Sequence, residues 1–273
     1  MKKMKILISA DMEGISGVVA WEQVFPGGGD YERFRRVMTA EMNAAIEGAL
    51  AGGATDILVN DGHSSMTNII IEELHPAAQL VSGSPNPFGP MQGISSDLDK
   101  IFLVGAHSAA GTRASVLAHT WSRIIVEVRL NDRPIGEVGL NAALAGAFGK
   151  PVVLVTGDKA VTDEARALLG NIETVAVKES ITGSAAQCFH PKVSESYILE
   201  AARRALTLNT KLFTIQAPIT ICVGFQNTIQ ADMAEMIPGC NRIDGRTINW
   251  TGEDMSAVYQ TFQAMVALGK TQH

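Results

Sequence analysis

The sequence predicts an α/β fold with a mostly parallel central sheet, flanking helices and a smaller carboxyl-terminal α/β domain. Two observations support this prediction. Short apolar runs typical of buried strands alternate with helical patterns along most of the chain. From about residue 181 the pattern changes to longer helices around a few strands. We therefore expect two domains, residues 1–180 and residues 181–273, and a chain of 273 residues with 46% hydrophobic content can form both cores.

The amino-terminal part begins with a buried strand. The apolar run Ile6–Ile8 predicts this strand, which is expected to end at Asp11. From Asp30 to Gly52 apolar residues recur at helical spacing, and this predicts a long helix. Further strands are expected in the segments TDILVNDGH, QLVSG and KIFLVGAH, in that order along the chain.

The next segments continue the alternation of strands and helices. RIIVEVRLNDRPIGE predicts two strands around an Asn131–Asp132 turn. A helix rich in Ala and Gly (VGLNAALAGAFG), a strand (KPVVLVTGD) and a helix around Glu164–Leu169 follow. In the smaller domain we expect a long helix over Glu195–Leu208, a strand in APITICVGF, a further helix and a final helix from Asp254.

Charge and cysteine content exclude several classes of protein. The net charge is -6, so no general attraction to nucleic acid or to anionic membranes is expected. The three cysteines, Cys188, Cys222 and Cys240, lie far apart and form no CxxC pair. A disulfide framework is therefore not expected, and a reducing, cytoplasmic location fits best. No secretory signal and no apolar stretch long enough to cross a bilayer is expected.

Polar side chains gather where the predicted strands end. Asp11 and Glu13 follow the first strand, and in a strand residues i and i+2 point to the same face. Ligand sites in open α/β sheets lie at the carboxyl ends of the strands. The full set of candidate residues at these ends is Asp11, Glu13, His63, His107 and Glu137, with His119 a dozen residues beyond His107.

This set of side chains indicates a metal site in the 1–180 domain. Imidazole nitrogen and carboxylate oxygen are the zinc ligands used when thiolates are absent. Three carboxylates and two imidazoles exceed the three protein ligands of a catalytic mononuclear zinc, and they suit two metal ions that share a bridging carboxylate. Each residue alone has a plainer explanation: a loop histidine at the surface, an Asp that caps a turn, or a Glu at the positive end of a helix.

The same residues lie in motifs that resemble a known family, the zinc-dependent D-aminopeptidases of the dipeptide-degrading type. The resemblance rests on SADMEGISG, YERFRRVMTAEMNAAIEGAL, ILVNDGHSSMTN, LHPAAQLVSG, FLVGAHSAAGT, LAHTW and LNDRPIGEVGLNAALAGAFGKPVVLVTGD, and continues more weakly through TVAVKESITGSAA and MIPG. It implies that Asp11, Glu13, His63, His107 and Glu137 bind two zinc ions, with Asp11 as the bridge, and that His119 is the catalytic side chain. It also implies a homodecamer.

The function expected on this basis is hydrolysis of short peptides with an amino-terminal D-residue, such as D-Ala-D-Ala. His119 would act as base, acid, oxyanion donor or nucleophile, and Asp61 is our candidate for orienting a histidine ligand. Two alternatives remain open from the residues themselves. One is a dinuclear metal hydrolase that acts on another amide or on a phosphoester. The other is a non-catalytic α/β protein that binds a metal or a ligand.

Overall fold

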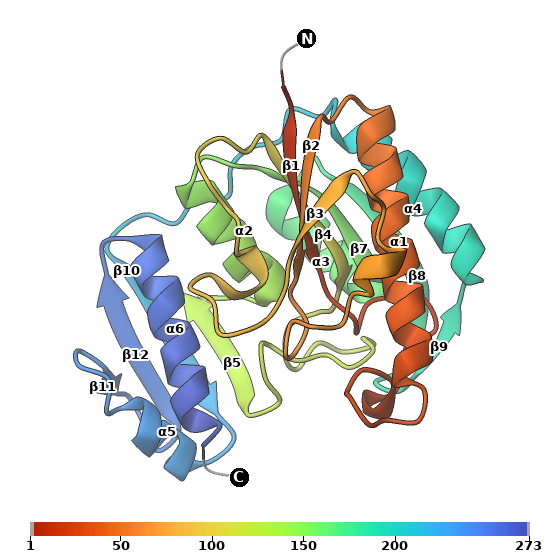
Figure 1. Cartoon of the computed structure of the whole chain (residues 1–273). Helices are drawn as coiled ribbons and strands as arrows, with labels where there is room; N and C mark the ends of the chain where they lie inside the picture. Colours follow the sequence, from red (N-terminus) through yellow and green to blue (C-terminus); the bar gives the residue numbers. More distant parts are fainter. Residues whose placement is uncertain (1–2, 272–273) are drawn as a thin grey trace.

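A seven-stranded sheet forms the centre of the computed structural model, which describes residues 3–271 (Figure 1). The strand order is β3-β2-β1-β4-β7-β8-β9, and every neighbouring pair is parallel except β8 and β9. The strands are β1 (Lys5–Ala10), β2 (Asp56–Asp61), β3 (Ala78–Val81), β4 (Lys100–Ala106), β7 (Val152–Asp158), β8 (Glu173–Thr182) and β9 (Ala185–Cys188). The predicted mostly parallel sheet is confirmed.

Two helices cover each face of this sheet. Helices α1 (Tyr31–Ala51) and α4 (Pro191–Ala205) pack side by side on one face, and α2 (Glu137–Ala147) and α3 (Lys159–Leu169) pack on the other. Helix α1 buries Phe34, Met38 and Met42, which recur every fourth residue and form one apolar stripe. Three short 3-10 helices lie in loops, at Trp21–Gln23, Ile71–Glu73 and Gly89–Met91.

A second, antiparallel sheet stands beside the first, in the order β11-β12-β10-β5-β6. Its elements are β5 (Ile125–Leu130), β6 (Arg133–Pro134), β10 (Ile219–Phe225), β11 (Asn241–Arg242) and β12 (Thr247–Gly252), with helices α5 (Thr228–Ala234) and α6 (Met255–Gly269). Two of its strands thus precede residue 180, so the division of the chain into two domains near that residue stays a prediction.

The second sheet and α2 share one hydrophobic core. Helix α6 packs against α2, and the buried hydroxyl of Tyr259 donates to Asn141 Oδ1 at 2.6 Å. This contact fixes the carboxyl-terminal part of the chain next to the amino end of α2. Residues from α6 and from the end of β10 are thereby brought to the rim of the large sheet.

Most predicted elements are confirmed, with changes at their ends. Helix α1 matches the prediction, and Asn131 and Asp132 form the predicted turn, with φ of 46° and 63°. Helix α4 begins earlier than predicted because His190 caps it and Pro191 occupies its first turn. Strand β9 was not predicted; its short run AAQC pairs only with the end of β8.

Glycine allows the loop after β1 to approach the end of β4. Gly105 has φ +79°, and a Cβ there would lie 2.1 Å from Asp11 O. A Cβ on Gly14 would lie 2.0 Å from Ala106 O, and Gly14 N donates to Gly105 O at 2.8 Å. Side chains at these positions would separate the two backbones. Within residues 3–271, no helix is long and apolar enough to span a membrane.

Candidate metal centre

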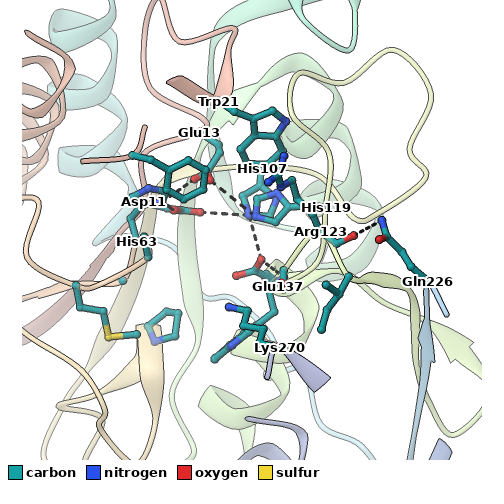
Figure 2. A pocket seen from close by; sticks show the side chains of 18 residues that line it. Asp11, Glu13, Trp21, His63, His107, His119, Arg123, Glu137, Gln226 and Lys270 are labelled. Carbon is teal, nitrogen blue, oxygen red and sulfur yellow. Dashed lines mark hydrogen bonds and ion pairs between the residues drawn. The ribbon is translucent and has the colours of Figure 1, made fainter. Parts of the chain in front are cut away.

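The six candidate residues converge on one cavity at the carboxyl ends of β1, β2 and β4 (Figure 2). The structure brings all of them together: Asp11, Glu13, His63, His107, His119 and Glu137 line this cavity. Three are buried, with His63 at 4%, His107 at 3% and Glu13 at 2% exposure as residues, and the other three are partly buried. The convergence predicted from the strand ends is therefore present in the fold.

Asp11 and Glu13 meet for a reason other than strand alternation. Strand β1 ends at Ala10, so both carboxylates stand on the loop that follows it. The buried ammonium of Lys178, from β8, donates to the carbonyls of Glu13, Ile15 and Val18 at 2.6, 2.9 and 2.7 Å. These three bonds fold the loop around the Lys178 side chain, which the sequence analysis did not identify.

His63 faces both carboxylates with one ring nitrogen. Its Nδ1 lies 3.2 Å from Asp11 Oδ1 and 2.9 Å from Glu13 Oε2. Its Nε2 lies 2.7 Å from the carbonyl oxygen of Val24, which can only accept, so Nε2 carries a proton. In the neutral ring the lone pair is then on Nδ1 and points at the two carboxylates.

His107 repeats this arrangement with the opposite nitrogens. Its Nδ1–H donates to Ser108 O at 3.1 Å. Its Nε2 lies 3.0 Å from Glu137 Oε1 and 3.4 Å from Asp11 Oδ2. Asp11 therefore lies between the two imidazoles, with one oxygen directed to each.

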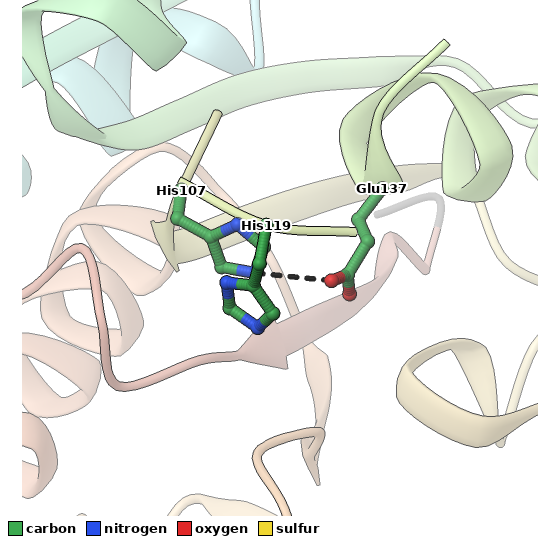
Figure 3. Close-up of side chains that lie close together, drawn as sticks. All are labelled: His107, His119 and Glu137. Carbon is green, nitrogen blue, oxygen red and sulfur yellow. Dashed lines mark ion pairs between the residues drawn. The ribbon is translucent and has the colours of Figure 1, made fainter. Parts of the chain in front are cut away.

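His119 is placed over His107 by the loop that joins them. The two rings stack with centroids 3.7 Å apart and planes 18° from parallel (Figure 3). His119 N donates to Ser108 O at 3.2 Å, which closes the loop. The Nδ1–H of His119 donates to Leu117 O at 2.9 Å, and its Nε2 lies 3.8 Å from Glu13 Oε1.

Glu137 is the first residue of α2, as the sequence suggested. Its Oε1 accepts a bond from Trp121 N at 2.5 Å as well as facing His107. The amino end of a helix favours a carboxylate, so the local fold and the backbone donor both stabilise its charge. Burial alone would raise the pKa of Glu137, but His107 outweighs burial and lowers it.

Burial and neighbouring charges shift the pKa values of the residues in this cluster. Burial and the adjacent Glu13 carboxylate raise the pKa of Asp11 to about 6. Burial lowers the pKa of His107, but Glu137, Asp11 and Glu13 together raise it to about 10. Burial likewise lowers the pKa of His63, and Glu13 and Asp11 together raise it well above its usual value. Protons on these two rings thus supply the cation that the three carboxylates require. Burial and the charge on His107 lower the pKa of His119 to about 4.

The donor set fits divalent metal ions. Asp11, Glu13 and His107 offer ligand atoms within 4.8 Å of one another, and so do His107, His119 and Glu137. Every outer N–H of the three histidines is donated to a backbone carbonyl, as metal-binding imidazoles require. No thiolate lies among the cavity residues. Imidazole and carboxylate donors of this kind suit zinc.

Asp61 does not orient a histidine ring, contrary to the sequence-based expectation. Its buried carboxylate accepts from Asn68 N, Asn68 Nδ2 and Ile69 N at 2.5, 2.8 and 2.7 Å. Asn68 Nδ2 in turn donates to His63 O at 2.7 Å. Asp61 therefore shapes the loop that carries His63, while the carbonyls of Val24, Ser108 and Leu117 orient the rings.

An open α/β sheet with a cluster of carboxylates and imidazoles at its carboxyl edge defines a class of protein, that of α/β proteins with a metal site at the strand ends. The comparison with known proteins is more specific. The model of the peptidase family M55, described as D-aminopeptidase, matches residues 4–264, so the chain belongs to this family.

Two relatives support this assignment over nearly the whole length of the chain. A D-aminopeptidase of Bacillus subtilis (strain 168) is 37% identical over 268 residues, which cover 97% of each chain. The solved structure of the Zn-dependent D-aminopeptidase DppA from Bacillus subtilis, described as a self-compartmentalizing protease, superposes with a TM-score of 0.95 at 37% identity and 98% coverage of both chains. These values confirm the family resemblance stated from the sequence motifs.

Proposed function

We propose that this protein is a zinc-dependent aminopeptidase that removes an amino-terminal D-residue from short peptides such as D-Ala-D-Ala. One observation supports it above the others: three imidazoles, each fixed by a backbone carbonyl, direct their inner nitrogens at three carboxylates in one cavity. Membership of the D-aminopeptidase family and the zinc dependence of the Bacillus subtilis relative agree with this proposal.

The proposed ligands of two zinc ions are Asp11, Glu13, His63, His107 and Glu137. Asp11 is the proposed bridge because its two oxygens face different imidazoles, His63 and His107. Bound zinc would supply positive charge that polarises the scissile carbonyl and acidifies water. Zinc at this end of the cavity would also bind the free amine of a peptide, which favours cleavage after the first residue.

His119 is the proposed catalytic side chain. Its Nδ1–H is donated to Leu117 O, so a lone pair on Nε2 faces the cavity and can accept a proton from attacking water. The same nitrogen can then give this proton to the departing amine. Trp21 contacts the ring edge-on with centroids 5.1 Å apart, and together with His107 it restricts rotation of the imidazole.

The test compares release of alanine from D-Ala-D-Ala and from L-Ala-L-Ala, with zinc-loaded protein and with the same protein after treatment with a chelator. We expect turnover of the D-dipeptide only, lost with the chelator and restored by zinc. Zinc bound to the protein with turnover of neither dipeptide would overturn the proposed substrate. In that case hydrolysis of p-nitrophenyl phosphate would indicate a phosphoesterase. A protein that binds zinc but cleaves neither the dipeptides nor this phosphoester would be a non-catalytic binding protein.

We also propose a homo-oligomer, with ten subunits as the expected size, in the cytoplasm. The self-compartmentalizing assembly described for the Bacillus subtilis relative supports this. Light scattering coupled to size-exclusion chromatography measures the mass directly. A particle with the mass of one 29.0 kDa chain at micromolar concentration would contradict an assembly of this type.

A further inference from the structure

The cavity that holds the carboxylates and imidazoles also contains two cations that the proposed reaction does not use. It has a volume of about 500 Å³, and Arg123 and Lys270 are part of its lining. Neither side chain forms an ion pair or a side-chain hydrogen bond with any of residues 3–271. The two residues come from distant parts of the chain, so no local sequence pattern places them together.

Arg123 lies on the side of the cavity next to the catalytic histidine. Its guanidinium stands 5.1 Å from the centre of the Trp21 ring, and Trp21 contacts His119. Gln226, at the end of β10, donates from Nε2 to Arg123 O at 2.6 Å and fixes the backbone there. The Trp21 ring thus lies on one side of the guanidinium, and the N–H groups of Arg123 donate to no other atom of residues 3–271.

Lys270 lies on another side of the same cavity. It directly follows α6, as the C-cap residue of that helix, and Figure 2 shows its side chain near Glu137. Burial lowers the pKa of the Lys270 ammonium, and the Glu137 carboxylate opposes that shift. The two groups are more than 4 Å apart, since they form no ion pair among the described residues. The ammonium therefore keeps its donors for another acceptor.

The cavity consequently has opposite charges in different places. Three carboxylates lie around the histidines, and two cations line other parts of the wall. A dipeptide at neutral pH is a zwitterion whose two charges are separated by at most about 7 Å in an extended chain. An amine held at the metal centre leaves the carboxylate of the second residue in the same cavity, on the far side of the scissile bond.

We propose that Arg123 and Lys270 form a binding site for the free terminal carboxylate of the substrate, so that the enzyme prefers unblocked dipeptides. This inference rests on the proposed aminopeptidase function and names the substrate class of that site. An arginine fork matches a carboxylate with two parallel hydrogen bonds, and the lysine adds a point charge from another direction. A blocked carboxyl group would lose both interactions.

The test uses zinc-loaded protein and two substrates that differ only at the terminus, D-Ala-D-Ala and D-Ala-D-Ala-amide. We expect kcat/KM to be about 10- to 100-fold higher for the free acid, the range of a charge-assisted contact. In Arg123→Met and Lys270→Met this ratio should fall toward one, mainly through loss of activity on the acid. Lys270→Arg should retain most of the preference. Arg113→Met and Lys211→Met, exposed cations outside the cavity, are the matched controls.

Calorimetry with a dipeptide analogue whose peptide bond is reduced to CH2–NH gives a readout that needs no turnover. The free acid should bind about 10-fold or more tightly than its amide, and only the two cavity variants should lose this difference. Equal binding of acid and amide, or a preference that both variants retain, overturns the inference. If neither substrate is cleaved but the analogue still shows the preference, the aminopeptidase proposal fails and the carboxylate site stands.

Discussion

The imidazole rings of His107 and His119 stack face to face at 3.7 Å between centroids. Each ring donates its Nδ1–H to a nearby carbonyl, so both present Nε2 to the cavity. Two positive charges at this separation repel strongly, and only one ring can be protonated in the absence of metal. His107 has the closer carboxylate partner, Glu137, and therefore takes the charge while His119 remains neutral.

His119→Ala should lower kcat/KM for D-Ala-D-Ala by about 10²- to 10⁴-fold, the range for loss of a general acid–base. Zinc content, measured by atomic emission on the purified protein, should stay at the wild-type value. A loss of zinc would instead make His119 a ligand, which its distance to the His107 and Glu137 ligand atoms also permits. His75→Ala, outside the cavity, serves as the control and should leave kcat/KM unchanged.

Asp11→Asn should reduce the zinc content by at least one ion per chain and weaken the affinity for the remainder by about tenfold or more. The amide nitrogen that replaces one oxygen has no lone pair for a metal, and the bridge between His63 and His107 is lost. Competition with a fluorescent zinc chelator measures both quantities. Asp163→Asn, at an exposed ion pair with Lys159, is the matched control. Full zinc occupancy in Asp11→Asn would refute the bridging role.

Lys178→Met should destabilise the protein by about 3 kcal/mol or more, because it leaves three buried carbonyls without a donor. The loop that carries Asp11 and Glu13 then loses its contact with β8, so the zinc affinity should fall as well. Urea unfolding and zinc competition, both below the melting temperature of the variant, separate the two effects. Unchanged zinc affinity in a destabilised variant would show that the loop is positioned by other contacts. Lys159→Met, on the surface, provides the comparison.

Glu41→Gln should make stability less dependent on pH between 4.5 and 7. Burial raises the pKa of Glu41 to about 7, although Ser16 N donates to its Oε1 at 2.9 Å. The folded state therefore keeps a proton on this carboxyl that the unfolded state releases above pH 4.5. The contribution of this protonated carboxyl to the free energy of unfolding is fully present below pH 4.5. It is lost as the pH rises through 7, and the free energy of unfolding falls by about 3 kcal/mol as a result.

Denaturant unfolding of wild type and Glu41→Gln at pH 5 and pH 8, with equal zinc loading, measures this effect. The variant should gain stability relative to wild type at pH 8, and little at pH 5. The comparison cancels the titration of the metal site, since both proteins contain it. The same difference between the proteins at both pH values would contradict a protonated Glu41 in the folded state.

Local patterns in the sequence were sufficient for most of the helices and strands and for the choice of the candidate ligands. Strand and helix periods recur over short distances, and helix α1 was located to within a residue because its apolar stripe is uninterrupted. Strand β9 was missed since its four residues have no alternation of their own and depend on β8 for pairing. Asp61 was expected to orient a histidine ligand because it lies two residues before His63 in the sequence. In the structure its carboxylate accepts from Asn68 instead.

By itself, the sequence determined which side chains follow the strands, and because parallel strands end at one edge, this was enough to bring Asp11, Glu13, His63 and His107 together. His119 and Glu137 join them from the loop after β4 and from the start of α2. Only the tertiary structure decided how they are arranged. The Val24 carbonyl that fixes His63 and the ammonium of Lys178 under the loop join residues far apart in the chain, and the stacking of His119 on His107 depends on the fold of the loop between them. Arg123 and Lys270 are also far apart in the chain. Such contacts depend on the packing of whole elements, which no local pattern of residue types encodes.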